Sequence, residues 1–172
     1  MKINAIRLIA KFARFTGAIT LFGLGQVAWA GIAIQHWTQP TGAQVYLVES
    51  HSLPMVDLRI DMDAGSRHDP PALAGLASVM AASMSDGVRA SGQEPALDEH
   101  QLAEAWADLG AAFSAGASAD RLSFSLRSLT EPELLAGAVA LAARQLAEPA
   151  FPAALWQRDR PKWIASLREA RT

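Results

Sequence analysis

The side chains that could bind a metal or transfer a proton are few and far apart in this sequence. Its 172 residues include four histidines and no cysteine. The histidines are His36, His51, His68 and His100. No two of them form a His-x-His pair or stand four residues apart, so a metal site would need ligands from distant segments. His68 with the adjacent Asp69 is the best metal candidate, but we interpret all four as surface or loop residues.

Two other groups contain residue types found in active sites. Ser66 lies in Gly65-Ser66-Arg67-His68, which lacks the G-x-S-x-G pattern and the strand-to-helix turn of a serine nucleophile. We therefore interpret Ser66 as a turn residue. Asp57, Asp61 and Asp63 resemble paired carboxylates. Their even spacing places them on one face of a strand, where solvation explains them.

Alternating residues predict the strands that carry these groups. Val56, Leu58, Ile60 and Met62 alternate with charged residues, which predicts a strand with one buried and one solvated face. Residues 45–48 and 32–37 predict two earlier strands. Residues 113–118 and 122–127 alternate in the same way around a short turn and predict a β-hairpin.

Four helices are expected, at about residues 72–84, 98–109, 130–148 and from 152 onwards. Asp98 with Gln101 predicts a capping box for the second helix, and Thr130 with Glu133 predicts one for the third. Pro161 is expected to kink or break the last helix. The element order predicts an α+β fold, a mainly antiparallel sheet with helices packed on one side.

The first 30 residues are typical of a secretory signal peptide. A basic start precedes an apolar run from Phe15 to Ala30, which ends in the cleavage pattern Ala28-Trp29-Ala30. An uncleaved anchor is the alternative, but the run is shorter than a membrane-spanning helix needs. We expect residues 31–172 to form a single domain, whole or truncated at its C-terminal end, that is secreted, into the periplasm of a Gram-negative source.

Charge also limits the class of partner. The segment 1–30 contains four basic and no acidic residues, so its removal changes the net charge from −2 to −6. An acidic domain without a cluster of Lys and Arg argues against nucleic-acid binding. After signal cleavage, no stable membrane span is expected.

Several motifs, in their order, resemble the pitrilysin/insulinase family of zinc metallopeptidases. They are Pro40-Thr41-Gly42 before Val45, Leu53-Pro54-Met55-Val56 before Gly65-Ser66-Arg67, Leu109-Gly110-Ala111 before 122–126, and Glu148-Pro149-Ala150-Phe151. The resemblance runs from about Trp37 to Ala170. This part of the sequence is similar to the N-terminal homologous domain of bacterial members. The resemblance implies that the chain folds as that family's metallopeptidase-like α+β domain.

The resemblance also implies that the catalytic groups are missing. Active members carry H-x-x-E-H on a helix, two zinc ligands with a general base between them. With Gly75-Leu76-Ala77 aligned to the family's lead-in, Ser78, Ala81 and Ala82 take these three places. The third zinc ligand, a Glu in the last helix, falls on Gln157, with Asp159 close by. No catalytic, cofactor or metal residue is therefore expected in this chain.

The resemblance implies a non-catalytic subunit or domain. It would pair with an active pitrilysin/insulinase-type subunit around a chamber in which peptide substrates are cleaved, and zinc is expected only in that partner. Two alternatives remain open. One is a zinc metalloendopeptidase with a non-standard metal site whose ligands the sequence does not identify, and zinc lost on mutating His68 or Asp159 would support it. The other is a free-standing peptide-binding module.

Overall fold

The computed structural model describes residues 33–169, so the expected signal peptide lies outside the described residues. The chain divides into two compact units, residues 1–50 and 51–172. In the first, β1 (Ile34–Thr38) and β2 (Gln44–Val48) form an antiparallel hairpin. Both strands were expected from the sequence. Among residues 33–169, no helix is long and apolar enough to cross a membrane.

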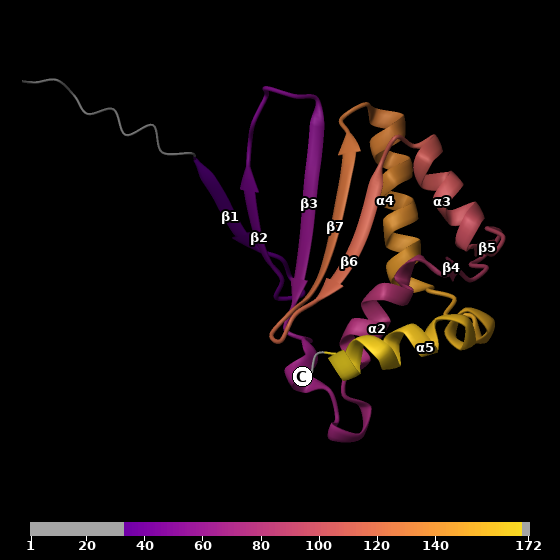
Figure 1. Cartoon of the computed structure of the whole chain (residues 1–172). Helices are drawn as coiled ribbons and strands as arrows, with labels where there is room; N and C mark the ends of the chain where they lie inside the picture. Colours follow the sequence, from indigo (N-terminus) through magenta and orange to yellow (C-terminus); the bar gives the residue numbers. More distant parts are fainter. Residues whose placement is uncertain (1–32, 170–172) are drawn as a thin grey trace, which may run out of the picture. The chain divides into compact units, whose positions relative to one another are not determined.

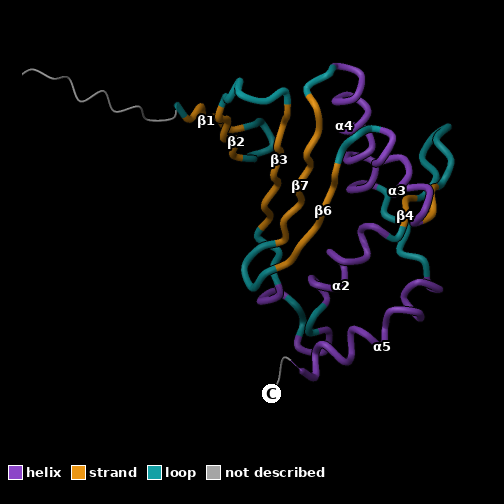
Figure 2. Tube along the Cα trace, turned by 45° about the horizontal axis from the view of Figure 1, so that its top comes forward, coloured by secondary structure: helices purple, strands orange, loops and turns teal. Residues whose placement is uncertain are grey.

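The second unit is built on a three-stranded antiparallel sheet. Its strands are β3 (Met55–Met62), β6 (Ala112–Ala117) and β7 (Leu122–Leu129), and β7 lies in the centre. The register pairs Leu58 with Leu126, and Phe113 with the same Leu126. Figures 1 and 2 show the three strands side by side with helices next to them. The predicted α+β fold is confirmed.

Four α-helices complete this unit: α2 (Leu76–Ala82), α3 (Glu99–Asp108), α4 (Pro132–Ala147) and α5 (Ala153–Glu169). Short 3₁₀ turns lie at Ser66–His68 (η1), Pro71–Leu73 (η2) and Ser83–Ser85 (η3). A small two-stranded ladder, β4 (Gly87–Val88) with β5 (Leu97–Asp98), precedes α3. The sequence did not predict this ladder.

The core lies between one face of β7 and the helices. Leu122, Phe124 and Leu126 are all buried, and because they alternate along β7 they share one face. Leu126 packs with α3 and α4, while Leu122 and Phe124 pack with Ala81 and Met84. The helices therefore cover one face of the sheet, as the sequence predicted.

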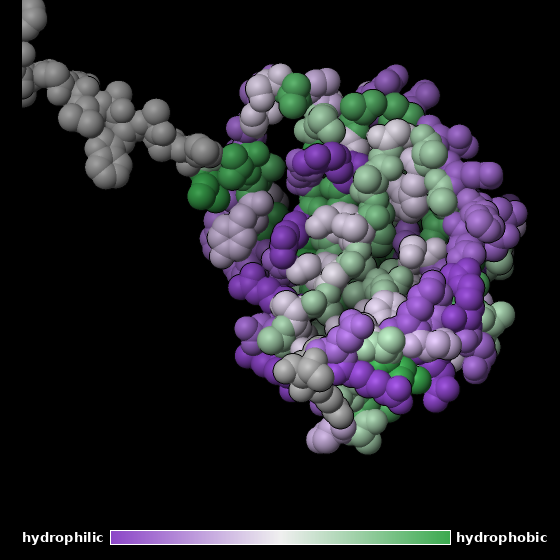
Figure 3. Space-filling view, in the orientation of Figure 1, coloured by the Kyte–Doolittle hydropathy of each residue, from purple (hydrophilic) through white to green (hydrophobic). Residues whose placement is uncertain are grey.

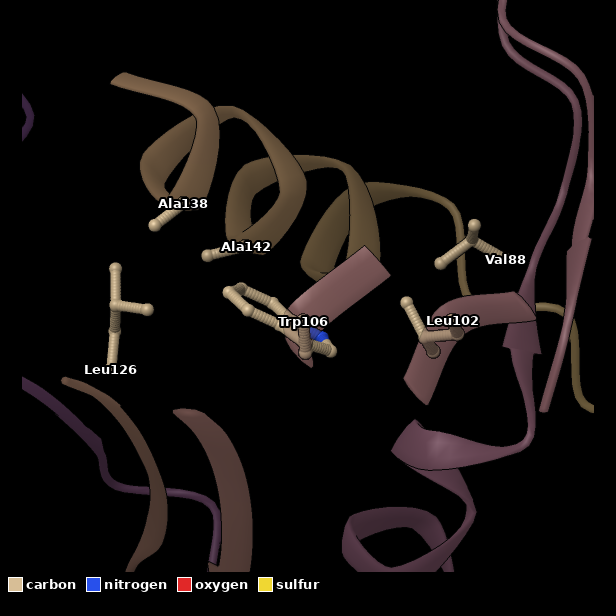
Figure 4. Packing of buried hydrophobic residues seen from close by; sticks show 6 residues of the cluster. All are labelled: Val88, Leu102, Trp106, Leu126, Ala138 and Ala142. Atoms are coloured by element: carbon tan, nitrogen blue, oxygen red, sulfur yellow. The ribbon is translucent and has the colours of Figure 1, made fainter. Parts of the chain in front are cut away.

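Trp106 of α3 joins the helices to one another. In Figure 4 its ring lies in the middle of the cluster, with Leu126 on one side and Val88 and Leu102 on the other. The indole Nε1–H donates a 2.9 Å hydrogen bond to Oε1 of the buried Gln145, whose Nε2 donates a 2.7 Å bond to the carbonyl of Met84. Three elements, α3, α4 and η3, are thus linked by two buried hydrogen bonds.

The prediction that β3 has a buried face was wrong. Leu58 is 44% exposed, Ile60 38% and Met62 50%. The strand itself and its alternation are as expected, but α4 packs over the central strand β7 and not over the outer strand β3. The apolar side of β3 therefore remains open to solvent.

The predicted capping box was correct at the start of α3 and wrong at the start of α4. At α3, the Asp98 carboxylate accepts bonds from the backbone N–H groups of His100 and Gln101, and the Gln101 side chain accepts from the Asp98 N–H. This is the predicted capping box. At α4 the box with Thr130 does not form, because Pro132 begins the helix and Glu131 becomes the N-cap, without a side-chain bond.

The expected break of α5 at Pro161 does not occur. The helix runs from Ala153 to Glu169 with Pro161 inside it. Proline removes the hydrogen bond to the carbonyl four residues earlier, which belongs to Gln157. Gln157 is exposed, so water can satisfy this carbonyl and the cost of the lost bond is reduced.

Two alanine substitutions test the contrast between the helix starts. Asp98→Ala removes an acceptor that holds two backbone N–H groups, so it should lower the free energy of unfolding by about 1 kcal/mol. Thr130→Ala should change it by less than about 0.5 kcal/mol, because the Thr130 side chain caps nothing. Urea denaturation followed by circular dichroism measures both. Equal losses would mean that Thr130 does cap α4.

Candidate functional site

The segment of greatest interest is α2, where the sequence places the lost catalytic motif. Ser78 is exposed, Ala82 is half-buried and Ala81 is buried. None of the three side chains has a nitrogen, sulfur or carboxylate oxygen, which are the ligands that zinc takes in proteins. No zinc site can be built on α2 from these residues.

The start of α2 is held by a residue that no sequence pattern assigned to it. The Asp69 carboxylate accepts bonds from the backbone N–H groups of Gly75, at 2.8 Å, and Ala77, at 3.1 Å. Gly75 has a φ of 96°, a left-handed conformation that glycine adopts without strain. The predicted helix 72–84 therefore begins late, at Leu76. Helix caps are normally sought within three residues of the start, and Asp69 lies seven residues before Leu76.

The inward side of α2 is made of small residues that lie against the sheet. Ala81 is 5% exposed and packs in a cluster with Met84, Leu122 and Phe124. Its methyl group lets the helix lie close to β6 and β7. Position 81 therefore has a packing role in this chain, where the resemblance places a catalytic glutamate in active enzymes.

The other predicted position, Gln157, is exposed on α5. Its neighbour Arg158 donates to both oxygens of Glu99, with a shortest distance of 2.8 Å, and so connects α5 to the start of α3. Arg158 also lies 2.9 Å from Asp159, which in turn is 3.2 Å from Lys162. The hydrogen bond from Arg158 is the main reason why the pKa of Asp159 is lowered. Asp159 is thus already neutralised by two cations.

Comparison with known proteins places this arrangement in a family. Residues 44–171, most of the chain, match the model of the insulinase peptidases, family M16. The chain belongs to this family. Its fold is similar to the crystal structure of a peptidase M16 inactive domain from Pseudomonas fluorescens, with 34% sequence identity and a TM-score of 0.70, over 79% of this chain and 31% of that chain. A search of the curated proteins found no match.

The M16 chain is also similar to pitrilysin, with 26% identity and a TM-score of 0.57. This similarity covers 84% of the present chain and 15% of pitrilysin. The present chain therefore spans less than a third of either relative. The predicted pitrilysin/insulinase membership is confirmed, and one of the two relatives is itself described as inactive.

The histidine considered as a metal ligand lies elsewhere in this M16 domain. His68 Nε2 is 3.2 Å from Asp63 Oδ1, and Arg67 is 2.7 Å from the same oxygen. Hydrogen bonds from His68 and then Arg67 lower the pKa of Asp63. The carboxylate of Asp69 is used at the start of α2. Within residues 33–169, no three His, Asp or Glu side chains form a group that could hold a metal.

Restoring the motif tests where the lost site lies. The combined variant Ser78→His, Ala82→His and Gln157→Glu should bind about one zinc ion per chain, because it provides three ligands and leaves the buried Ala81 in its packed cluster. Metal analysis after dialysis measures the zinc, and a higher urea midpoint with zinc present confirms that the folded state binds it. The matched control keeps Gln157. Equal zinc affinity in the control would show that α5 does not supply the third ligand.

A carboxyl beside this region makes the stability depend on pH. Burial raises the pKa of Asp86, and Asp159 and Glu99 nearby add to the rise. A raised folded-state pKa stabilises the fold below the unfolded pKa, and this contribution is lost as the pH rises through the folded value. Asp86→Asn should therefore raise the urea midpoint relative to the parent at pH 7, and the gain should vanish near roughly pH 3. The exposed Asp108→Asn is the control. A gain at low pH alone would contradict a raised pKa at Asp86.

Proposed function

We propose that this M16 domain is a non-catalytic subunit that pairs with an active zinc peptidase of its own family. The observation that carries the proposal is that α2 is retained, fixed at its start by Asp69 and packed through Ala81, while its three motif positions carry no zinc ligand. A helix held by the protein itself does not depend on bound metal for its position. The chain keeps the family fold but lacks, at these three positions, the side chains that would bind zinc.

An exposed apolar surface supports a role in binding another protein. On the helix side of the sheet, a cavity of about 180 Å³ opens between β3 and α4. Its lining includes Leu58, Ile60 and Val139, which are 44%, 38% and 48% exposed. The outward side of α4 continues it with small exposed residues, Ala136, Ala140, Ala143 and Ala147. Contiguous apolar surface of this kind is typical of protein–protein contacts.

In the proposed assembly, the active partner supplies zinc and the general base, and peptides are degraded in a chamber that both subunits enclose. The present chain contributes a wall and substrate contacts. We further propose that it is secreted, into the periplasm in a Gram-negative source, after cleavage of residues 1–30. Of the two alternatives, a non-standard zinc site is disfavoured by the donor set, because Asp159 is paired with Arg158 and Lys162.

Reconstitution tests the pairing. The full chain is mixed with an M16 peptidase of the same source that carries an intact H-x-x-E-H motif. We expect a complex in sedimentation-velocity runs and faster cleavage of a fluorogenic peptide than with the peptidase alone. Val139→Glu places a charge in the apolar surface and should weaken the complex by roughly tenfold.

The matched control is Ala103→Glu, which adds the same charge at an exposed position of α3. It should leave the complex unchanged. No complex and no change in peptidase activity would contradict the proposed function. A complex that forms equally well with both variants would keep the pairing but rule out the apolar surface as its site.

A further inference from the structure

The face of the sheet opposite the helices contains a broad trough over β6 and β7. Its volume is about 350 Å³. Small residues form its floor, since Ser114 lies opposite Ser125 and Gly116 opposite Ser123 in the register of the two strands. Figure 3 shows a pale surface over β6 and β7, beside strongly hydrophilic patches. The helices that contact the sheet do so on its other face, so none of them fills the trough.

The packing of this chain does not explain why residue 116 is a glycine. A Cβ added at this position would meet no atom within 4 Å, and its φ is not in the left-handed region. At Gly65 and Gly137 a Cβ would clash with a neighbour, and the other glycines among residues 33–169 have a positive φ. Glycine within a strand weakens it and often marks a place where a ligand or another backbone approaches closely. The empty space above Gly116 is such a place.

The charged residues that line the trough are both arginines. Arg59 and Arg121 share a single carboxylate, Asp61, with N–O distances of 2.9 Å and 3.5 Å. Asp61 also accepts a 2.5 Å bond from the Ser123 hydroxyl. Two guanidinium groups on one carboxylate leave one positive charge uncompensated. Both arginine side chains are more than 60% exposed, so their remaining N–H groups are available to a bound anion.

The hydroxyl groups of the floor add neutral hydrogen-bonding capacity. Ser114 and Ser125 line the trough, and neither side chain forms a hydrogen bond with the described residues. Ser114 and Gly116 of β6, and Ser118 just after it, follow at every second residue, which is the spacing at which side chains of an extended chain share one face. The lining contains no aromatic ring on which a sugar or base could stack, and no helix N-terminus for a phosphate.

We propose that the trough binds an extended, acidic peptide segment, whose carboxylates pair with Arg59 and Arg121 and whose backbone lies over Gly116. The serine hydroxyls of the floor bind the carbonyl and amide groups of this backbone. This site lies on the opposite face of the sheet from the apolar surface of α4 and β3. It needs neither zinc nor an active partner, and so goes beyond the pairing proposed above.

Binding is measured by fluorescence polarisation with the full chain alone. The probe is a labelled, capped peptide of alternating Gly and Glu, and the comparison peptide has Lys in place of Glu. We expect the acidic peptide to bind, the basic one not to bind, and the affinity to fall as salt rises. Arg59→Gln and Arg121→Gln should each lower the affinity by about fivefold. Arg89→Gln, an exposed arginine paired with Glu148 outside the trough, should leave it unchanged.

Gly116→Val is the most discriminating variant. Valine favours strands, and a Cβ at this position meets no atom within 4 Å, so the urea midpoint should stay equal or rise while binding of the acidic peptide is lost. Unchanged affinity in this variant would overturn the proposal, and so would equal binding of the acidic and basic peptides. Because no second subunit takes part in this experiment, either outcome leaves the pairing hypothesis to be decided by its own test.

Discussion

The described second unit depends on the burial of one face of the central strand β7. Leu122, Phe124, Leu126 and Ser128 are buried there, with flanking strands on both sides and helices above. The buried bonds from Trp106 to Gln145 and from Gln145 to Met84 then fix α3, α4 and the end of the α2 segment to one another. Each bond satisfies a polar group that would be costly to bury alone.

This arrangement explains how α2 keeps its place. Asp69 holds the backbone at its start, and Gln145 binds the Met84 carbonyl just beyond its end. Between these points Ala81 packs against Phe124 and Leu122. The helix is therefore positioned by a carboxylate, an amide and a methyl group, all within the chain. A metal ion could be lost from such a segment without loss of the fold, which is consistent with an inactive member of a peptidase family.

Much of the fold could be predicted from local patterns. The period-two alternation located β3, β6 and β7, and the Asp98–Gln101 pair located the start of α3, because both signals act between close neighbours in the sequence. The errors came from distant partners. The exposure of Leu58 depends on which strand α4 covers, and the start of α2 depends on Asp69. At α4, Pro132 shifts the helix start by one residue, so the predicted Thr130 capping box does not form.

The candidate site was predictable only in part, for the same reason. A helix lies at Leu76–Ala82, where the family motifs predicted one, and Ser78, Ala81 and Ala82 remain the predicted motif positions on it. The sequence did not reveal that Asp159 is paired with Arg158 and Lys162. The trough went unnoticed because serine, glycine and arginine on alternate strand positions are ordinary for a solvated face. It becomes visible only when the register brings Ser114 and Ser125, and Gly116 and Ser123, side by side.

The strand register also places the apolar surface of β3 and α4 and the trough over β6 and β7 on opposite faces of the sheet. Leu58 and Ile60 lie opposite Leu126 and Phe124 and so face the helix side, whereas Arg59 lies opposite Ser125 and faces the other side. An apolar partner surface and an acidic segment would thus contact opposite faces of one thin sheet. Since β3 contributes to both, a partner that covers Leu58 and Ile60 would also restrain the backbone that carries Arg59. The two contacts are then distinct in chemistry and lie on opposite faces of the same strand.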